Sequence, residues 1–108
     1  MTDWIEVTVP DALVERRPAR VTVYGEPVLL LKADDVLFAI GNQCTHQGAR
    51  LDKGVIRLAG SVRTVTCPAH GSMFRLEDGK VVRPPATKPV PAYDAKVEDG
   101  RILVRLRE

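Results

Sequence analysis

Two short runs, each with one cysteine and one histidine, constrain this chain more than any other feature of its sequence. The first run places one residue between Cys44 and His46, and the second places two residues between Cys67 and His70. These are the only cysteines and histidines among the 108 residues. Thiolates and imidazoles are common ligands of transition metals. A fold that brings the runs together therefore builds a site with two sulfur and two nitrogen ligands.

The order of these ligands distinguishes the metal centres that could use them. Structural zinc also accepts two sulfurs and two nitrogens, but the usual finger order places both cysteines before both histidines. Here each run carries one of each type, which suits a [2Fe–2S] centre with two thiolates on one iron and two imidazoles on the other. A zinc site, an empty site and a Cys44–Cys67 disulfide stay open as alternatives. A disulfide would leave both histidines unexplained, and cytosolic cysteine pairs more often bind metal or perform redox chemistry.

Composition and charge bound the class of protein. A chain of 108 residues that is 44% hydrophobic and 28% charged is ordinary for one soluble domain with one core. Its formal net charge of +2 gives no strong electrostatic case for nucleic acid or membrane binding. Residues 41–70 carry four basic side chains and one acidic side chain, so the part that contains both runs has a net charge of +3.

Nothing in the sequence predicts export or membrane anchoring. The longest apolar run, Val28 to Leu31, is far shorter than the about twenty residues that cross a bilayer. The Arg16-Arg17 pair is followed by Pro18 and not by the apolar region of an export signal. We therefore expect a cytoplasmic protein.

Short stretches rich in valine, isoleucine and leucine alternate with turn signals, which predicts an antiparallel all-β domain. A short helical turn is expected over Asp11 to Glu15. Both metal-ligand runs follow a predicted strand, so we expect them on loops that project from a rigid sheet. The predicted strands are Ile5 to Val9, Arg20 to Tyr24, Pro27 to Lys32, Val36 to Ile40, Val62 to Cys67, Ser72 to Leu76 and Arg101 to Leu106. The predicted turns are Gly25, Asp34-Asp35, Asp78-Gly79 and Asp99-Gly100.

With these two runs the chain resembles the Rieske ferredoxin family, whose pattern is Cys-x-His, an intervening loop and then Cys-x-x-His. The resemblance implies an all-β fold, an antiparallel β-sandwich of the Rieske type with a small inserted subdomain that binds the cluster. It implies a single domain over residues 1–108, with the cluster-binding insert at roughly 41–85. It also implies one [2Fe–2S] cluster, held at the tip by the two cysteines and the two histidines.

The resemblance assigns roles to residues around the four ligands. Gly48 and Gly71 would let the backbone turn tightly and aim amide N–H groups at the cluster sulfurs, which would favour the reduced state. Pro84 and Pro85 match a proline-containing loop that shields the cluster on a third side. Gln47 and the proline loop would border the surface on which a partner docks.

Several positions depart from the respiratory branch of the family. That branch has a further cysteine in each loop, and the two form a disulfide; here Ala49 and Ala69 occupy those positions. A serine hydroxyl that donates to a cluster sulfur is retained as Ser72, whereas the corresponding tyrosine is Phe74. One donor is kept and one is lost, so we expect a reduction potential in the lower part of the Rieske range of about −150 to +300 mV. We also expect Met73 and Phe74 to cover the base of the cluster.

The resemblance is strongest to the ferredoxin component of bacterial multicomponent aromatic-ring dioxygenases. It implies a soluble, monomeric one-electron carrier that accepts electrons from a flavin-containing, NAD(P)H-dependent ferredoxin reductase and delivers them to a terminal Rieske non-haem iron oxygenase. The carrier is not itself an enzyme, because all four cluster ligands are protein side chains. The alternatives are the small Rieske-like subunit of an assimilatory nitrite reductase and a zinc-stabilised interaction module. Arg50 would contribute to a basic docking surface.

Overall fold

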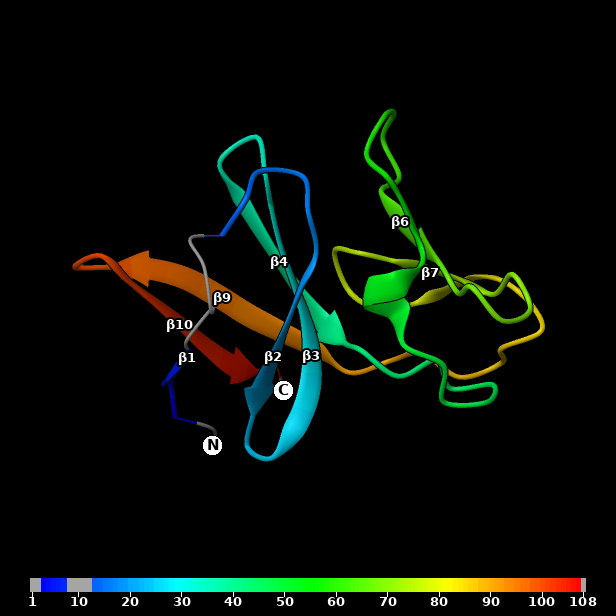
Figure 1. Cartoon of the computed structure of the whole chain (residues 1–108), viewed down its shortest axis with the longest axis horizontal. Coiled ribbons are helices and arrows are strands. Elements are labelled where there is room, and N and C mark those ends of the chain that lie inside the picture. Colours follow the sequence, from blue (N-terminus) through cyan, green and yellow to red (C-terminus); the bar gives the residue numbers. More distant parts are fainter. Residues whose placement is uncertain (1–2, 8–12, 108) are drawn as a thin grey trace.

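The computed structural model describes residues 3–7 and 13–107, and this part of the chain is built almost entirely from antiparallel β-strands (Figure 1). The first sheet has the strand order β1-β10-β9-β4-β3-β2 and the second has the order β5-β6-β7-β8. The prediction of an antiparallel all-β fold is confirmed. The first sheet consists of β1 (Ile5–Val7), β2 (Ala19–Val23), β3 (Glu26–Ala33), β4 (Val36–Gly41), β9 (Ala92–Glu98) and β10 (Arg101–Leu106). Between β4 and β9 lie the 3-10 helix η1 (Leu51–Lys53) and the second sheet, β5 (Val55–Arg57), β6 (Thr64–Thr66), β7 (Met73–Arg75) and β8 (Val81–Arg83).

Strand β3 lies between two hydrophobic cores. Leu29 and Leu31 face the core between the two sheets, which also contains Val65 and Phe74 of the second sheet. Leu30 faces a second core, enclosed by the six-stranded sheet, whose edge strands β1 and β2 contact each other. Because side chains alternate along a strand, burial of both faces requires an uninterrupted apolar sequence. This explains the Val28 to Leu31 run as a central strand.

The hairpin turns lie where the sequence predicts them. Asp34 and Asp35 join β3 to β4 with φ angles of 52° and 65°, and Asp99 and Gly100 join β9 to β10 with φ angles of 52° and 75°. Two consecutive residues with positive φ form the tight turn whose twist matches that of the flanking strands. Aspartate and glycine tolerate this conformation better than other residues do.

Other strand predictions were incomplete or wrong. Strands β5, β8 and β9 were missed, and β6 is shorter than the predicted strand from Val62 to Cys67. Strand β9 contains Asp, Lys and Ala, which are weak strand formers, and it is stabilised by pairing with both β4 and β10. Residues 8–9 of the first predicted strand and 11–12 of the predicted helical turn lie outside the described residues, and residues 13–15 form no helix.

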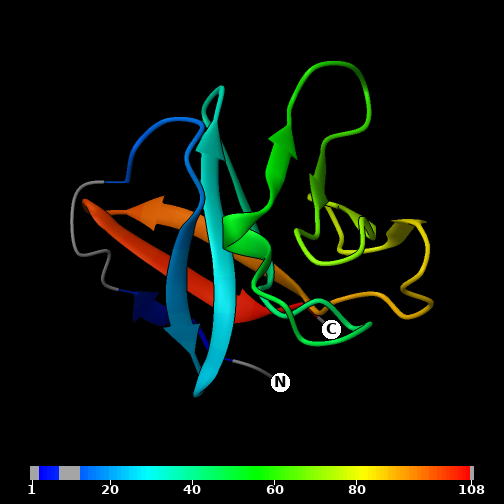
Figure 2. The same ribbon diagram turned by 45° about the vertical axis from the view of Figure 1, so that its right-hand side comes forward.

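The two sheets place both metal-ligand runs at one end of the molecule. The second sheet packs against the first through the shared core, and the segments that follow β4 and β6 extend from this junction (Figures 1 and 2). The segment after β4 contains Cys44, and the segment after β6 contains Cys67. Both cysteines belong to the core between the sheets, so the packing of the two sheets fixes their positions.

Candidate metal centre

Two loops with the same backbone hydrogen-bond pattern carry the cysteines and histidines. We call residues 44–49 the first loop and residues 67–72 the second loop. In each, the cysteine N–H donates to the carbonyl oxygen five residues later, and the cysteine carbonyl accepts the N–H of the glycine four residues later. The four bonds are Cys44 N to Ala49 O at 2.9 Å, Gly48 N to Cys44 O at 2.7 Å, Cys67 N to Ser72 O at 2.7 Å and Gly71 N to Cys67 O at 3.2 Å.

The loop glycines provide the turns that the sequence predicts. Gly48 and Gly71 have φ angles of 76° and 81°, in the left-handed region that glycine adopts without strain. Their own N–H groups donate to the carbonyl oxygens of Cys44 and Cys67. The N–H groups that face the Cys67 sulfur belong to Ala69 and His70, the two residues before Gly71. That these turns direct amide N–H groups at the cluster sulfurs stays a prediction.

The two thiols form a buried pair. Cys44 is 2% exposed and Cys67 is 3% exposed, and both are free thiols that belong to the same core. Burial raises the pKa of the Cys67 thiol and the neighbouring Cys44 adds to the rise, whereas the facing backbone N–H groups oppose it. The apolar side chains that share this core include Leu51, Val65 and Phe74.

The two imidazoles form a separate, exposed pair. The ring centroids of His46 and His70 are 5.3 Å apart, and the rings meet edge to face at 86°. Both histidines are exposed, and the Nε2 atom of His70 lies 2.9 Å from the Oε1 atom of Gln47. The site therefore has a dry sulfur end and a solvent-facing nitrogen end.

This arrangement bears on which metal centre the side chains suit. Within residues 3–7 and 13–107, no three His, Cys, Asp or Glu side chains gather closely enough to hold a single ion. A structural zinc ion needs four ligands around one point. Two thiols in one pair and two imidazoles in another match the ligand distribution of a two-iron cluster with different ligands on each iron.

A third segment, residues 84–90, is bound to both loops. The Thr45 hydroxyl of the first loop donates to the Lys88 carbonyl at 2.6 Å. The Ser72 hydroxyl of the second loop accepts the Ala86 N–H at 3.0 Å. Residues 84–90 begin with Pro84 and Pro85, which are exposed and joined by a cis peptide bond. The role of Thr45 was missed, because a threonine beside a cysteine carries no distinctive signal.

Ser72 is fully buried, and its hydroxyl proton has no acceptor among the residues that the structure describes. A buried donor without a partner is costly unless another group accepts its proton. Its position, five residues after Cys67 and at the end of the second loop, is compatible with a bond to a cluster sulfur. The hydroxyl would then serve two partners, because its oxygen also accepts the Ala86 N–H.

Hydrogen bonds among three polar residues that flank the first loop in the sequence support it. The buried Asn42 side chain donates to the Asp52 carboxylate at 2.7 Å and accepts the Asp52 N–H at 2.8 Å. Arg50 donates to the same carboxylate through two nitrogens, at 3.0 and 2.7 Å. Burial alone would raise the pKa of the Asp52 carboxyl, but hydrogen bonds from Arg50 and Asn42 hold it below its usual value. Arg50 thus supports the loop while 52% of its side chain stays exposed, and its role in docking stays a prediction.

The predicted roles of Met73 and Phe74 separate in the structure. Phe74 is fully buried in the core that contains both cysteines. Met73 is half-buried and lies on the opposite face of β7, beside Val55 and Arg83. Phe74 therefore shares a core with the two cysteines and Met73 does not, and that the two residues cover the base of the cluster stays a prediction.

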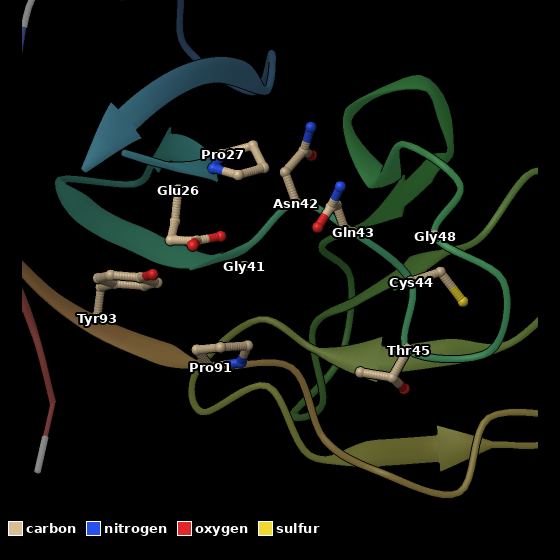
Figure 3. Close-up of a pocket in the computed structure, with 10 residues that line it drawn as sticks. All are labelled: Glu26, Pro27, Gly41, Asn42, Gln43, Cys44, Thr45, Gly48, Pro91 and Tyr93. Atoms are coloured by element: carbon tan, nitrogen blue, oxygen red, sulfur yellow. The ribbon is translucent and has the colours of Figure 1, made fainter. Parts of the chain in front are cut away.

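A groove of about 330 Å³ lies on the side of the first loop that faces the six-stranded sheet (Figure 3). The Cys44 sulfur points away from Glu26 and Tyr93 across this groove. Burial, and then the charge of Glu26, raise the pKa of the Tyr93 hydroxyl. The groove therefore lies between the first loop and the six-stranded sheet, on the side of Cys44 opposite to its sulfur.

Comparison with known proteins places this geometry in a family. Residues 3–94 match the Rieske [2Fe-2S] domain. The ferredoxin component of the naphthalene 1,2-dioxygenase system of Pseudomonas putida is 30% identical over 103 residues, which cover 95% of each chain. The solved structure of the ferredoxin of carbazole 1,9a-dioxygenase from Nocardioides aromaticivorans IC177 is 33% identical, with a TM-score of 0.84 and coverage of 94% of this chain and 95% of that one.

A second class of protein shares the fold. The putative NADH-dependent nitrite reductase small subunit from Mycobacterium tuberculosis is 27% identical, with a TM-score of 0.82 and coverage of 100% of this chain and 97% of that one. In the part of this chain that the structure describes, no helix is long and apolar enough to cross a membrane.

The matching domain covers most of the sequence and contains both loops. The chain therefore belongs to the Rieske [2Fe–2S] family, and its cofactor is one [2Fe–2S] cluster of the Rieske type.

Proposed function

We propose that the chain is a one-electron carrier in which Cys44 and Cys67 hold one iron while His46 and His70 hold the other. The observation that carries the proposal is the separation of the four side chains into a buried thiol pair and an exposed imidazole pair on two matching loops. When bound, the cluster takes up one electron and gives it back. The protein's part is to hold the cluster and to present it to partners.

The residues around the ligands suit this task. Leu51, Val65 and Phe74 keep water from the thiols, and low solvent exposure is one of the factors that set the potential of an iron–sulfur cluster. The imidazole end faces solvent, so a partner reaches the cluster from that side. With four protein side chains as ligands no coordination position is left for substrate, and we infer that the chain transfers electrons without catalysing a reaction itself.

We propose two electron-transfer partners from the similarity to dioxygenase ferredoxins. A flavin-containing, NAD(P)H-dependent ferredoxin reductase would supply electrons, and a terminal Rieske non-haem iron oxygenase would receive them. We further propose that the carrier works in the cytoplasm as a monomer and binds neither nucleic acid nor membranes. Residues 1–108 would form one Rieske domain, with residues 41–85 as its cluster-binding insert.

Iron and acid-labile sulfide analysis of the purified protein tests the proposal directly. We expect two irons and two sulfides per chain, together with the paramagnetic signal of a Rieske centre after reduction. Replacing His46 or His70 by cysteine should alter or abolish that signal. One zinc per chain without sulfide would overturn the proposal and favour the zinc-stabilised module.

The similarity to the nitrite reductase small subunit supports a second candidate function. In that case the chain would be purified from its host in a stable complex with a large sirohaem-containing subunit. A carrier would instead be isolated alone and would be reduced by NAD(P)H only when a flavoprotein reductase is added. Pull-down from the native host, followed by a sirohaem absorbance measurement, separates the two functions.

A further inference from the structure

Gln47 occupies in the first loop the position that His70 occupies in the second. Each is the third residue after its cysteine, and the two loops have the same backbone hydrogen bonds. Side chains at these positions meet between the loops, where Gln47 Oε1 lies 2.9 Å from His70 Nε2. His46, by contrast, has no hydrogen bond to any of the residues that the structure describes, although it also lies at the exposed end of the site.

This contact determines which nitrogen of His70 carries the proton. An amide oxygen only accepts hydrogen bonds, so Nε2 of His70 must be the protonated nitrogen. In the neutral ring the other nitrogen, Nδ1, then has the lone pair that a metal requires. A hydrogen bond to the outer nitrogen of a metal-bound histidine fixes the ring orientation and makes it a stronger electron donor.

We propose that Gln47 is a positioning residue that fixes the tautomer and orientation of His70 and makes the two histidines inequivalent. His70 has its outer N–H satisfied within the protein, whereas His46 offers its outer nitrogen to solvent or to an acceptor on a partner. His46 is thus the histidine through which a partner makes its hydrogen bond to the cluster end. This inference rests on the proposed function, because it requires that both histidines bind iron.

Residue-resolved chemical modification of the oxidised, cluster-loaded protein tests the inequivalence. Diethyl pyrocarbonate acylates a ring nitrogen that has lost its proton, and trypsin places His46 and His70 on different peptides because Arg50 and Arg63 lie between them. We expect His46 to react about threefold faster than His70, at the lower end of what one hydrogen bond contributes.

Three variants separate the hydrogen bond from other effects. Gln47→Leu removes the acceptor at similar volume and should bring the two rates together. Gln47→Glu keeps an acceptor and should preserve the difference. If the glutamine amide nitrogen were donating to His70 instead, Gln47→Glu would lose the difference, which would overturn the tautomer assignment. Gln43→Leu changes an exposed glutamine one residue before the first loop and should leave both rates unchanged.

The reduction potential of the cluster is a second measurement, and it would not change if Gln47 had only a structural role. Loss of electron donation from His70 in Gln47→Leu should favour the reduced form by about threefold, a rise of about 28 mV at 59 mV per tenfold. Equal rates in the unsubstituted protein, or an unchanged rate ratio in Gln47→Leu, overturns the inference. If Gln47→Leu loses its cluster, the inference is tested by comparing the modification rates of His46 and His70 in the unsubstituted protein and in Gln47→Glu. A protein without iron and sulfide instead refutes the proposed function itself.

Discussion

The first and second loops have the same backbone hydrogen bonds but differ in how their side chains are supported. Behind the first loop, Asn42 and Arg50 bind the Asp52 carboxylate, and the Thr45 hydroxyl donates outward to Lys88. The second loop relies on Ser72, whose buried hydroxyl accepts the Ala86 N–H. Backbone geometry therefore sets where the two cysteines lie, while side chains determine how firmly each loop is held.

The histidines show a second difference between the loops. His46 is two residues after its cysteine and His70 is three residues after its own. The imidazoles consequently leave the loops from non-equivalent positions and meet edge to face. Two matching loops can thus provide an asymmetric ligand set, and the position that is vacated in the first loop is occupied by Gln47, which binds His70.

The largest expected effect is loss of the cluster when the cysteine of either loop is replaced, because both loops supply one cysteine ligand. Cys44→Ala and Cys67→Ala should each abolish the cluster, because either change leaves one iron with a single protein thiolate. Iron content should fall to background in both variants, by the same amount. Ala69→Ser, a neighbouring substitution outside the ligand set, should retain full iron and sulfide. Retention of two irons by either cysteine variant would contradict the proposed ligands.

The next effect tests how the loops differ. Ser72→Ala leaves the Ala86 N–H buried without its acceptor and should destabilise the protein by about 1–3 kcal/mol. Thr45→Val should cost less, about 0.5–1 kcal/mol, because the Lys88 carbonyl lies in an exposed region where water can replace the hydroxyl. Urea unfolding of both variants measures the two costs. Equal costs would show that burial of Ser72 does not distinguish the loops.

The same pair of variants separates support from redox tuning. If the Ser72 proton binds a cluster sulfur, Ser72→Ala should also lower the reduction potential, since the lost bond favours the more negative, reduced state. Half of the about 1.5–3 kcal/mol of a bond to a charged acceptor corresponds to roughly 30–65 mV. Thr45→Val should leave the potential unchanged. A potential that does not move in Ser72→Ala, with the cluster intact, would limit Ser72 to a structural role.

Local signals in the sequence were sufficient for parts of the fold. The hairpin at Asp34-Asp35 and the buried strand from Val28 to Leu31 are specified by residue type alone, because positive φ and two buried faces each require particular side chains. Strand β9 was missed because its stability comes from β4 and β10, which are distant in the chain. Tyr24 was predicted as the last residue of a strand but lies in the turn between β2 and β3 and is 49% exposed, because the residues of a two-residue hairpin turn project from the sheet.

The candidate site shows the same division. The two Cys/His runs are visible because their residue types are rare in this chain and specific to metal binding. The contacts of Asn42, Thr45 and Gln47 join residues from separate segments, and no spacing rule predicts them. Arg50 was expected at a docking surface because its charge was visible in the sequence, whereas its bonds to Asp52 were not.

A smaller effect tests whether the loop backbones are truly equivalent. Gly48→Ala and Gly71→Ala each force a side chain into the left-handed region, at a cost of about 1–2 kcal/mol. Alanine also restricts the unfolded chain, which offsets about 0.4–1 kcal/mol, so a net loss of about 1 kcal/mol is expected for each. No heavy atom within 4 Å would meet the added carbon at either site, so steric contact does not bias the comparison. Clearly different losses by urea unfolding would show that one loop is the more strained.

The smallest effect concerns pH and the carboxylate beyond the second loop. Arg75 holds the pKa of the Asp78 carboxyl at about 2, against an ordinary value of 3.8; burial opposes this and the Lys80 N–H supports it. A depressed pKa stabilises the folded state above the unfolded value, and this stabilisation is lost as pH falls from about 4 towards 2.

Asp78→Asn keeps an oxygen for the Lys80 N–H but removes the charge, so it should reduce the free energy of unfolding at pH 5. Because the native protein loses its advantage in acid, the gap between the two proteins should narrow steadily as pH falls from about 4 towards 2. Urea unfolding of the unsubstituted protein and of Asp78→Asn at each pH measures the difference in their free energies of unfolding. Acid affects the cluster equally in the two proteins, so this effect cancels in the difference. Asp35→Asn, in a turn remote from the second loop, should show no such narrowing. A gap that stays constant with pH would mean that the charge of Asp78 does not stabilise the folded protein. The Arg50–Asp52 ion pair next to the first loop would then have no equivalent next to the second loop, where Ser72 would be the main support.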